Sequence, residues 1–377
     1  MIGILTFHRS HNYGSVLQSY ALQKWLGIHN WNSEIIDLYT NESMKLYKIF
    51  PSITTFKSIF WDLIYLYHYR ELKSKWTKFK KFQDNVLILS HKQYHSFNDL
   101  NNDKLMYTTY LTGSDQIWNT ICPDFNWAYY LEFATYGNFI SYAPSFGPLG
   151  KYEQHLDHKR IARNILRYSS VSVRDDGSAE FVEEITHQRP EVTVDPTLLL
   201  TKKDWESLMA EHEDPEFYSK LPKKYIFFYS LKRKPIDYNV IQKVKDTYHL
   251  PVVITDIKRK SDLKMDFVRT LDAGPVDFLS LVKHAELVVT SSFHGTVFSL
   301  LFEKKFFSIN GMKDNRISNL LLGTGLEAQS IDESTKLPPL GNINIDYDSA
   351  KEKLEKMTIH SEEFLQNALM EEKHGNL

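Results

Sequence analysis

The chain has 377 residues, and because this exceeds one ordinary domain of about 100 to 200 residues, we expect two domains, each able to bury its own core. A hydrophobic content of 42%, an aromatic content of 14% and a formal net charge of -2 exclude a disordered chain and a polycation that coats nucleic acid. A single cysteine, Cys122, excludes an internal disulfide framework and a cysteine metal cluster, so we expect a cytoplasmic protein.

The first predicted element is a strand, Ile2–Phe7, which lacks the charged start and the cleavage site of a secretory signal. It leads into a loop, His8–Gly14, and then a helix, Ser15–Leu26, whose apolar residues recur on one face. A second strand, Glu34–Tyr39, completes a right-handed βαβ unit.

The segment from Met44 to Phe82 combines nine lysine or arginine residues with many aromatic ones, against two acidic residues. This mixture favours contact with an anionic membrane surface or a phosphorylated partner. Aromatic residues in a core beneath a solvated lysine face are an equal alternative. Charged residues and a proline interrupt its apolar stretch, so we predict no membrane-spanning helix, and no nucleic-acid motif accompanies it.

Strands that alternate with helical stretches indicate an α/β protein with parallel sheets. Two prolines, Pro215 and Pro222, flank a polar stretch, so we place an N-terminal domain at 1–214 and a C-terminal domain at 215–340. The remaining 341–377 carries a predicted helix, Ser349–Met370, which we expect to pack on the N-terminal domain. The further predicted strands are Tyr107–Thr112, Asn138–Tyr142, Ser170–Val173, Val192–Val194, Tyr225–Ser230, Val252–Thr255, Leu287–Thr290 and Lys305–Ile309.

Polar loops follow several predicted strands, where ligands bind in open α/β sheets. In His8–Gly14, Asn12 offers both a donor and an acceptor, and Gly14 allows the backbone to approach a ligand closely. In Thr112–Asn119, Asp115 is a candidate base. Tyr142–Gly147 is a third such loop.

A fourth loop, Ser172–Asp175, contains Arg174. A guanidinium can hold a carboxylate or phosphate through two parallel hydrogen bonds and is never neutral. The alternative is an ion pair with a nearby acidic residue, for which the candidates are Asp175, Asp176 and Asp195.

The run Leu287–Phe302 passes from an apolar strand pattern to a helical pattern at Ser291–Gly295. The first turn of a helix has free N–H groups and the positive end of the helix dipole, which bind anions, and His294 adds a proton that can move near neutral pH. The alternative is a hydrogen-bonded structural histidine. Downstream, Arg316 follows a strand and precedes a predicted helix, Ser318–Leu322.

Two cations, a helix N-terminus and a histidine suit a small dianionic donor that carries both carboxylate and phosphate. The sequence has no Gly-x-x-x-x-Gly-Lys phosphate loop, no His-Glu-x-x-His pair and no Gly-x-Ser-x-Gly elbow. We therefore predict no metal site and no bound cofactor.

Five motifs occur in order along the chain: Asn12–Leu22, Gly113–Trp118, Ser172–Asp175, Asp195–Thr197 and Ser291–Gly295. Together they resemble the polysaccharide pyruvyl transferase family, over Ile2 to about Leu326. The resemblance implies two Rossmann-like lobes that face each other across a cleft, as in GT-B proteins. It implies phosphoenolpyruvate as co-substrate and a sugar hydroxyl pair as acceptor, in an exopolysaccharide or capsule or its lipid-linked precursor. The product is a pyruvate ketal.

Carried over by position, the resemblance makes His294 the catalytic acid, with Asp115 as the second catalytic residue. It implies acceptor contacts from Asn12, Tyr13 and Gly14. Segment 44–82 departs from the simpler members of the family, and its basic and aromatic residues also permit peripheral membrane contact. The donor contacts that the resemblance implies are Arg174, Ser292, Gly295, Thr296 and Arg316, with Lys313 as the alternative to Arg316.

Two other functions fit the same pattern. One is a GT-B glycosyltransferase that uses a nucleotide sugar, since such enzymes also place phosphate at a helix end of the second lobe. The other is a non-catalytic glycan-binding protein, against which the presence of Arg174, His294 and Arg316 argues.

Overall fold

The structure is a computed structural model that describes residues 1–49, 56–148, 156–212 and 214–370. The chain forms two compact units, which we describe separately. Unit 1 comprises Met1–Pro51, Lys81–Leu199 and Glu355–Leu377, and unit 2 comprises Ser52–Lys80 and Leu200–Leu354.

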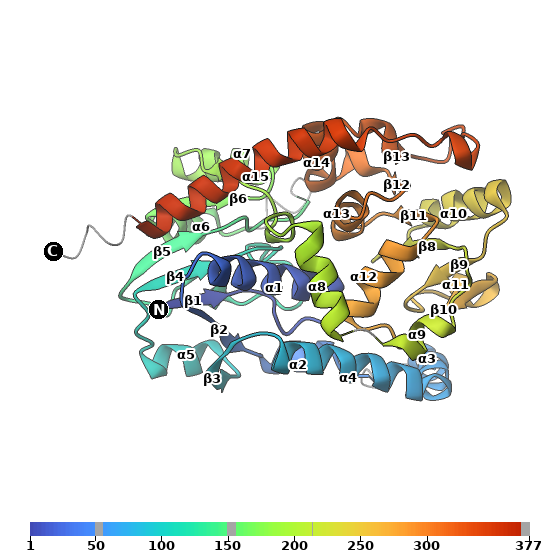
Figure 1. Ribbon diagram of the computed structural model, residues 1–377. Helices are drawn as coiled ribbons and strands as arrows, with labels where there is room; N and C mark the ends of the chain where they lie inside the picture. The colour runs from blue at the N-terminus through green and yellow to red at the C-terminus, as the bar shows by residue number, and fades with distance from the viewer. Residues whose placement is uncertain (50–55, 149–155, 213, 371–377) are drawn as a thin grey trace. The chain divides into compact units, whose positions relative to one another are not determined.

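Unit 1 contains a seven-stranded parallel sheet with the order β3-β2-β1-β4-β5-β6-β7 (Figure 1). Its central strands are buried at every residue, which is typical of a parallel sheet covered on both faces. The strands are β1 (Ile2–Leu5), β2 (Ser33–Leu38), β3 (Leu89–Tyr94), β4 (Thr109–Thr112), β5 (Asn138–Ser141), β6 (Ser170–Val173) and β7 (Glu191–Val192).

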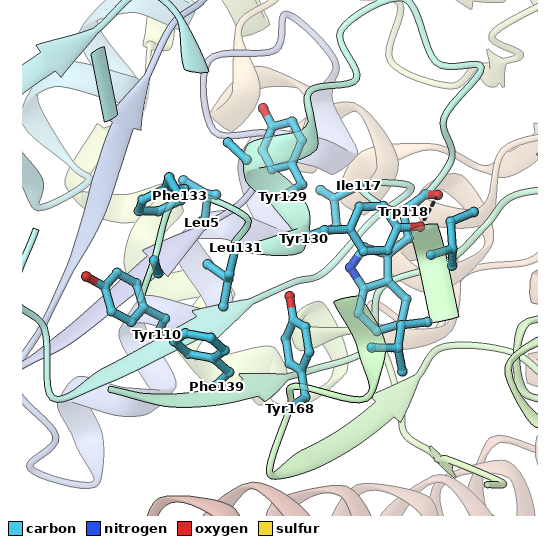
Figure 2. Packing of buried hydrophobic residues seen from close by; sticks show 14 of the residues in the cluster. Leu5, Tyr110, Ile117, Trp118, Tyr129, Tyr130, Leu131, Phe133, Phe139 and Tyr168 are labelled. Carbon is cyan, nitrogen blue, oxygen red and sulfur yellow. Dashed lines mark hydrogen bonds between the residues drawn. The ribbon is translucent and has the colours of Figure 1, made fainter. Parts of the chain in front are cut away.

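Aromatic side chains make up much of a core of unit 1 (Figure 2). Trp118 stacks on Tyr130 with ring centroids 5.4 Å apart, and meets Tyr168 edge-on at 5.8 Å. Such pairs add to the free energy gained by burying the rings. The helices that lie wholly in unit 1 are α1 (Tyr13–Ile28), α2 (Asn41–Leu46), α5 (Phe97–Asp103), α6 (His158–Ile165) and α7 (Asp176–Thr186).

Unit 2 contains a six-stranded parallel sheet with the order β10-β9-β8-β11-β12-β13. An aliphatic core that includes Ile226, Val252, Leu287 and Val289 lies against it. The strands are β8 (Ile226–Tyr229), β9 (Val252–Ile254), β10 (Phe267–Arg269), β11 (Leu287–Thr290), β12 (Phe306–Ile309) and β13 (Ser330–Ile331). The helices are α3 (Phe56–Tyr67), α8 (Lys202–His212), α9 (Pro215–Ser219), α10 (Pro235–Tyr248), α11 (Lys260–Lys264), α12 (Pro275–His284), α13 (Phe293–Leu301) and α14 (Asn315–Thr324).

Two continuous helices belong to both units, α4 (Tyr69–Asn85) and α15 (Tyr347–Met370). The later part of α15 packs in unit 1, where Trp25 Nε1 donates a hydrogen bond to Glu362 Oε1 at 2.8 Å. The earlier part of α4 packs in unit 2, where Lys78 Nζ lies 2.8 Å from Asp277 Oδ2.

The units divide the chain differently from the predicted domains. The predicted boundary at 214 lies inside unit 2, because unit 2 begins again at Leu200 with α8. Most of segment 44–82 also belongs to unit 2, in part because Lys78 bonds to both Asp214 and Asp277.

Candidate functional site

Each sheet has a point where the order of its strands reverses, and loops at the carboxyl ends of the two strands there form a binding crevice in α/β proteins. In unit 1 this point lies between β1 and β4. Ser15, in the first turn of α1, donates a 2.5 Å hydrogen bond to Asp115 Oδ2 in the loop after β4. The two loops are therefore joined at the crevice.

Local geometry fixes Asp115 in its place. Gly113 has a φ of 138°, and a Cβ there would lie 1.9 Å from the carbonyl oxygen of Tyr142, so only glycine fits. Ser114 N–H donates to Gln18 Oε1 at 3.0 Å. Trp118, fully buried in the aromatic core, anchors the far end of the loop. The predicted catalytic aspartate thus lies on a rigid loop.

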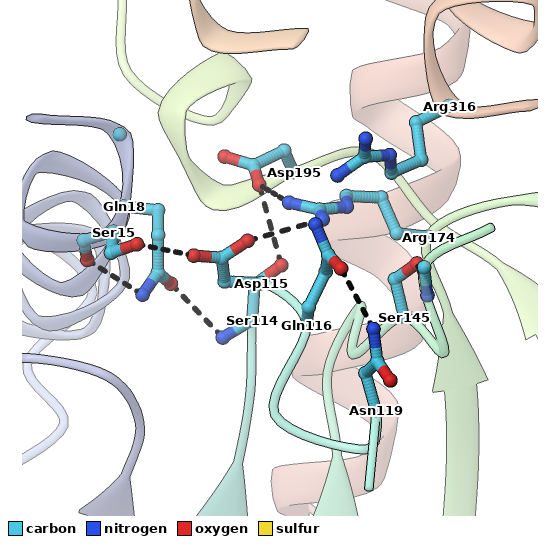
Figure 3. Close-up of polar contacts among 12 residues, drawn as sticks. Ser15, Gln18, Ser114, Asp115, Gln116, Asn119, Ser145, Arg174, Asp195 and Arg316 are labelled. Carbon is cyan, nitrogen blue, oxygen red and sulfur yellow. Dashed lines mark hydrogen bonds and ion pairs between the residues drawn. The ribbon is translucent and has the colours of Figure 1, made fainter. Parts of the chain in front are cut away.

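Arg174 lies in a buried network of two carboxylates (Figure 3). Its Nη1 is 2.6 Å from Asp195 Oδ2, and its Nη2 is 3.3 Å from Asp115 Oδ1. The guanidinium side chain is only 1% exposed. The ion pair with Asp195 that the sequence left open therefore forms, and Asp115 joins it.

The other two candidate partners of Arg174 have different roles, and Asp176 Oδ1 lies 3.9 Å from Arg189 Nη2. Asp175 caps α7, where its side chain accepts from Ser178 N–H at 2.9 Å, and it accepts a second bond from Ser145 Oγ at 2.7 Å. Asp195 also accepts hydrogen bonds from the N–H and the hydroxyl of Thr197, at 3.0 and 2.7 Å. The first and last residues of the Asp195–Thr197 motif are therefore bonded to each other.

The predicted acceptor residues form the start of α1. Asn12 is its N-cap and accepts from Gly14 N–H at 3.0 Å. Asn12 is half-buried, whereas Tyr13 and Gly14 are buried. Of the three, Asn12 presents its side chain most openly to a ligand.

Sequence reasoning missed the charges that hold the preceding loop. Arg9 bonds to both carboxylate oxygens of Asp37, at 2.7 and 2.6 Å, and His8 Nε2 lies 3.0 Å from the same group. Burial alone would raise the pKa of Asp37, but these hydrogen bonds outweigh it and hold that pKa well below its ordinary value. The sequence feature that could have indicated this network is the acidic residue Asp37 near the end of the predicted strand Glu34–Tyr39.

In unit 2 the strand order reverses between β8 and β11. Hydroxyl groups, rather than charges, join the loops there. Ser291 Oγ donates to Ser230 Oγ at 2.8 Å, and Ser230 Oγ donates to Asp237 Oδ2 at 2.8 Å. The predicted strand-to-helix junction is confirmed, since β11 ends at Thr290 and α13 begins at Phe293.

The first turn of α13 brings together the predicted residues Ser292, His294, Gly295 and Thr296. Ser292 is the N-cap in an extended conformation, but its hydroxyl does not cap the helix. His294 is 7% exposed. A Cβ on Gly295 would lie 2.2 Å from Thr290 Oγ1, so glycine is needed for the helix to pack on the strand. The helix N-terminus is therefore compact and suited to an anion.

The second predicted cation lies on α14 rather than between a strand and a helix. Arg316 is the second residue of α14, and its guanidinium holds both oxygens of Asp314, the N-cap of that helix, at 2.9 and 2.6 Å. The alternative, Lys313, is exposed. Lys313 therefore has the freer side chain, and Arg316 the more fixed one.

A buried arginine of unit 2 escaped prediction. Arg233 is 1% exposed and lies 2.5 Å from Asp256 and 2.7 Å from Asp262. Beside it, Lys75 Nζ donates to the carbonyl oxygen of Thr255 at 3.1 Å. Burial, partly offset by the charge of Asp256, lowers the pKa of Lys75 to about 8. The signal was the basic run Lys232–Lys234 directly after a predicted strand.

Segment 44–82 has both buried aromatic side chains and exposed apolar ones, and its contact with a membrane or a phosphorylated partner stays a prediction. Phe79 and Phe82 are buried, as in the core alternative. Leu63, Leu66 and Tyr67, at the end of α3, are exposed large apolar side chains. Within the ranges that the structure describes, no helix is long and apolar enough to cross a bilayer, and no three His, Cys, Asp or Glu side chains are grouped to hold a metal ion.

A family model described as polysaccharide pyruvyl transferase matches residues 12–311. Comparison with curated protein sequences found no significant match. The structure is similar to UDP-GlcNAc 2-epimerase from Rickettsia bellii, with a TM-score of 0.55, 10% identity and coverage of 100% of this chain and 97% of that one.

Two further solved structures are similar. One is the Methanocaldococcus jannaschii UDP-GlcNAc 2-epimerase in complex with UDP-GlcNAc and UDP, with a TM-score of 0.51, 12% identity and coverage of 95% and 99%. The other is a UDP-N-acetylglucosamine 2-epimerase described as putative from Listeria monocytogenes, with a TM-score of 0.52, 11% identity and coverage of 95% and 89%. These likenesses confirm the predicted α/β fold with two Rossmann-like units of the GT-B kind.

Proposed function

Because this chain belongs to the polysaccharide pyruvyl transferase family, we propose that it transfers the pyruvyl group of phosphoenolpyruvate to two hydroxyls of a sugar. The product is a cyclic pyruvate ketal on a polysaccharide or on its lipid-linked precursor, and phosphate is released. No resident cofactor takes part in this proposal.

One observation supports the donor site more than any other: a buried histidine on an uncapped helix N-terminus. The first-turn amides of α13 and its dipole favour the phosphate or carboxylate of the donor. His294 lies in the same turn, where it can donate a proton to a bound donor. Ser292, Gly295 and Thr296 shape this turn, and Lys313 or Arg316 supplies a cation.

In the proposed reaction, His294 gives a proton to the methylene carbon of phosphoenolpyruvate, which becomes the methyl group of the ketal. Positive charge then builds on the adjacent carbon. One sugar hydroxyl loses its proton and bonds to that carbon, the carbon–phosphate oxygen bond breaks, and the second hydroxyl closes the ring. Phosphate leaves with one of the two hydroxyl protons, which balances the equation.

The role of Arg174 as a donor ligand stays a prediction. Two carboxylates hold its guanidinium, so it also serves to fix Asp115. The acceptor is a sugar, and the exposed end of α3 (Leu63, Leu66 and Tyr67) is compatible with a lipid-linked form or with peripheral membrane contact.

The test combines binding with turnover. Phosphoenolpyruvate should raise the melting temperature of the protein, and phosphate should appear only when a sugar acceptor is also present. UDP-GlcNAc is the matched comparison. A thermal shift with UDP-GlcNAc but none with phosphoenolpyruvate would favour the nucleotide-sugar alternative and remove pyruvyl transfer.

A further inference from the structure

Unit 1 has a second polar cluster near its crevice, made by Ser10, His11, Tyr47 and Asp124. Tyr47 Oη lies 2.5 Å from Asp124 Oδ2 and 2.9 Å from Ser10 Oγ. The imidazole of His11 stacks on the ring of Tyr47, with 5.2 Å between centroids and 16° between planes. Three segments that are far apart in the sequence therefore meet at one place.

The cluster is built on rigid supports. The β1–α1 loop that carries Ser10 and His11 is held by Arg9, which bonds to Asp37 and, at 2.6 Å, to Asp84. Gln83 also donates to the carbonyl oxygen of Ser10 at 3.0 Å. Such supports hold a binding site in its bound geometry before the ligand arrives.

The other two members are equally fixed. Tyr47 ends α2, where its N–H donates to the carbonyl oxygen of Ser43 at 3.0 Å. Asp124 precedes Phe125, which packs against the aromatic core and meets Trp127 edge-on at 5.2 Å. His11, Tyr47 and Asp124 are all half-buried, so each is packed yet reaches the surface.

The cluster lies on the loop that borders the crevice, because Ser10 Oγ accepts a hydrogen bond from Asn12 N–H at 3.2 Å, and Asn12 is the N-cap of α1. The pKa of Asp124 is raised, chiefly by burial and further by the negative charge of Asp115. The hydrogen bond from Tyr47 lowers it, but by less. Asp115 is committed to Ser15 and Arg174, whereas Asp124 bonds to a neutral hydroxyl.

We propose that Ser10, His11, Tyr47 and Asp124 bind a hexopyranose unit of the acceptor, and that Asp124, rather than Asp115, takes the proton of the attacking hydroxyl. The stacked rings offer a flat apolar surface to the C–H face of a pyranose, and the carboxylate and hydroxyls bind its O–H groups. The proton moves to Asp124 while the electron pair of the O–H bond forms the new bond to the pyruvyl carbon. This assignment rests on the proposed function.

The first experiment measures sugar binding without any donor. Saturation-transfer NMR is recorded with the methyl glycosides of glucose, galactose, mannose and N-acetylmannosamine. At least one glycoside should bind the wild type, and the variants His11→Ala and Tyr47→Ala should weaken that binding 10-fold or more. No binding by the wild type, or equal binding by these variants, would overturn the assignment.

The second experiment separates binding from proton transfer. Asp124→Asn should bind the same glycoside within about 3-fold of wild type and lower kcat for phosphate release about 100-fold. Asp103→Asn is the matched control, because Asp103 accepts a bond of the same 2.5 Å length from Tyr94. Equal kcat for Asp124→Asn and Asp103→Asn would refute Asp124 as the base.

The two failures are distinguishable. If the wild type binds a glycoside through His11 and Tyr47 but never releases phosphate from phosphoenolpyruvate, the sugar site stands and pyruvyl transfer falls. If phosphate is released at wild-type rates by His11→Ala, Tyr47→Ala and Asp124→Asn, the proposed function stands and this acceptor site is wrong.

Discussion

The two crevices of this protein have the same topology but opposite chemistry. In unit 1, Ser15, Asp115, Arg174 and Asp195 form a chain of charge-assisted bonds between neighbouring loops. In unit 2, Ser230 and Ser291 join the equivalent loops through hydroxyls, next to His294. Charges fix geometry firmly, because breaking one leaves another buried without its partner. The hydroxyls add no charge of their own where the loops meet, although Ser230 Oγ also donates to the carboxylate of Asp237 at 2.8 Å.

The buried arginines sharpen this comparison. Arg174 and Arg233 are each 1% exposed and each lie between two aspartates. Only Arg174 adjoins the predicted catalytic Asp115. A buried arginine between two aspartates therefore occurs in both units, but only the one in unit 1 lies next to a residue with a predicted catalytic role.

The largest effect is expected from Arg174→Gln and its matched control Arg233→Gln. Each removes one partner of a buried ion network and should lower the free energy of unfolding by about 3–5 kcal/mol, as measured by urea denaturation. If Arg174 also binds donor, only Arg174→Gln should abolish the thermal shift with phosphoenolpyruvate. Arg174→Lys, which keeps the charge but loses the planar fork, serves if the first variant does not fold. A full shift in both Arg174 variants would leave it a purely structural residue.

Next is His294→Ala, which tests the hydroxyl-lined crevice. Loss of a general acid should lower kcat for phosphate release about 100-fold or more, with little change in stability. His284→Ala is the control in the same unit, since His284 makes a hydrogen bond to the carbonyl oxygen of Ser280 at the end of α12. Wild-type kcat in His294→Ala would remove the proposed acid.

A smaller effect is expected from Gly295→Ala. The new methyl group would lie 2.2 Å from Thr290 Oγ1, a buried atom, so α13 must shift, and overpacking of this kind lowers stability by about 1–3 kcal/mol. Gly27→Ala, in α1, has nothing within 4 Å and should instead stabilise the protein by about 0.5–1 kcal/mol. Similar melting temperatures for the two variants would contradict the close packing of α13 on β11.

The last effect concerns Lys75, beside Arg233, and is seen only as a change of stability with pH. Its pKa is lowered from 10.5 to about 8, chiefly by burial. Between these values the unfolded chain binds the proton and the folded chain does not, so stability rises with pH from about 8 to 10.5. Urea denaturation across this range should show the stability of wild type rising relative to Lys75→Met. The exposed Lys73→Met is the control, and an equal slope in both comparisons would refute the buried environment of Lys75.

Much of the fold could be predicted from sequence. The ten predicted strands all lie on strands of the structure or within two residues of them, because buried parallel strands are short apolar runs that end at turn residues. The strands β3, β10 and β13 were missed. β3 and β10 are edge strands that carry polar or charged residues, and β13 has only two residues, so none has a strong apolar signal.

The candidate site was predictable in part. The motif around His294 was identified because a strand-to-helix junction has a local pattern in the sequence. The pairing of Arg174 with Asp195 was one of three candidates and its pairing with Asp115 was not predicted, since these residues lie 21 and 59 positions from Arg174 in the chain. The cluster of His11, Tyr47 and Asp124 left no signal, because its members come from three segments that only the folded sheet brings together.

By itself, the sequence determined the two parallel sheets, the family and the identity of the groups at the strand ends, because strand periodicity and helix starts depend on residues close together in the chain. The tertiary structure alone decided which carboxylates hold Arg174 and Arg233, and that Phe79 and Phe82 of segment 44–82 are buried. These outcomes depend on contacts between distant segments and on the exclusion of water around charges, neither of which a local pattern contains.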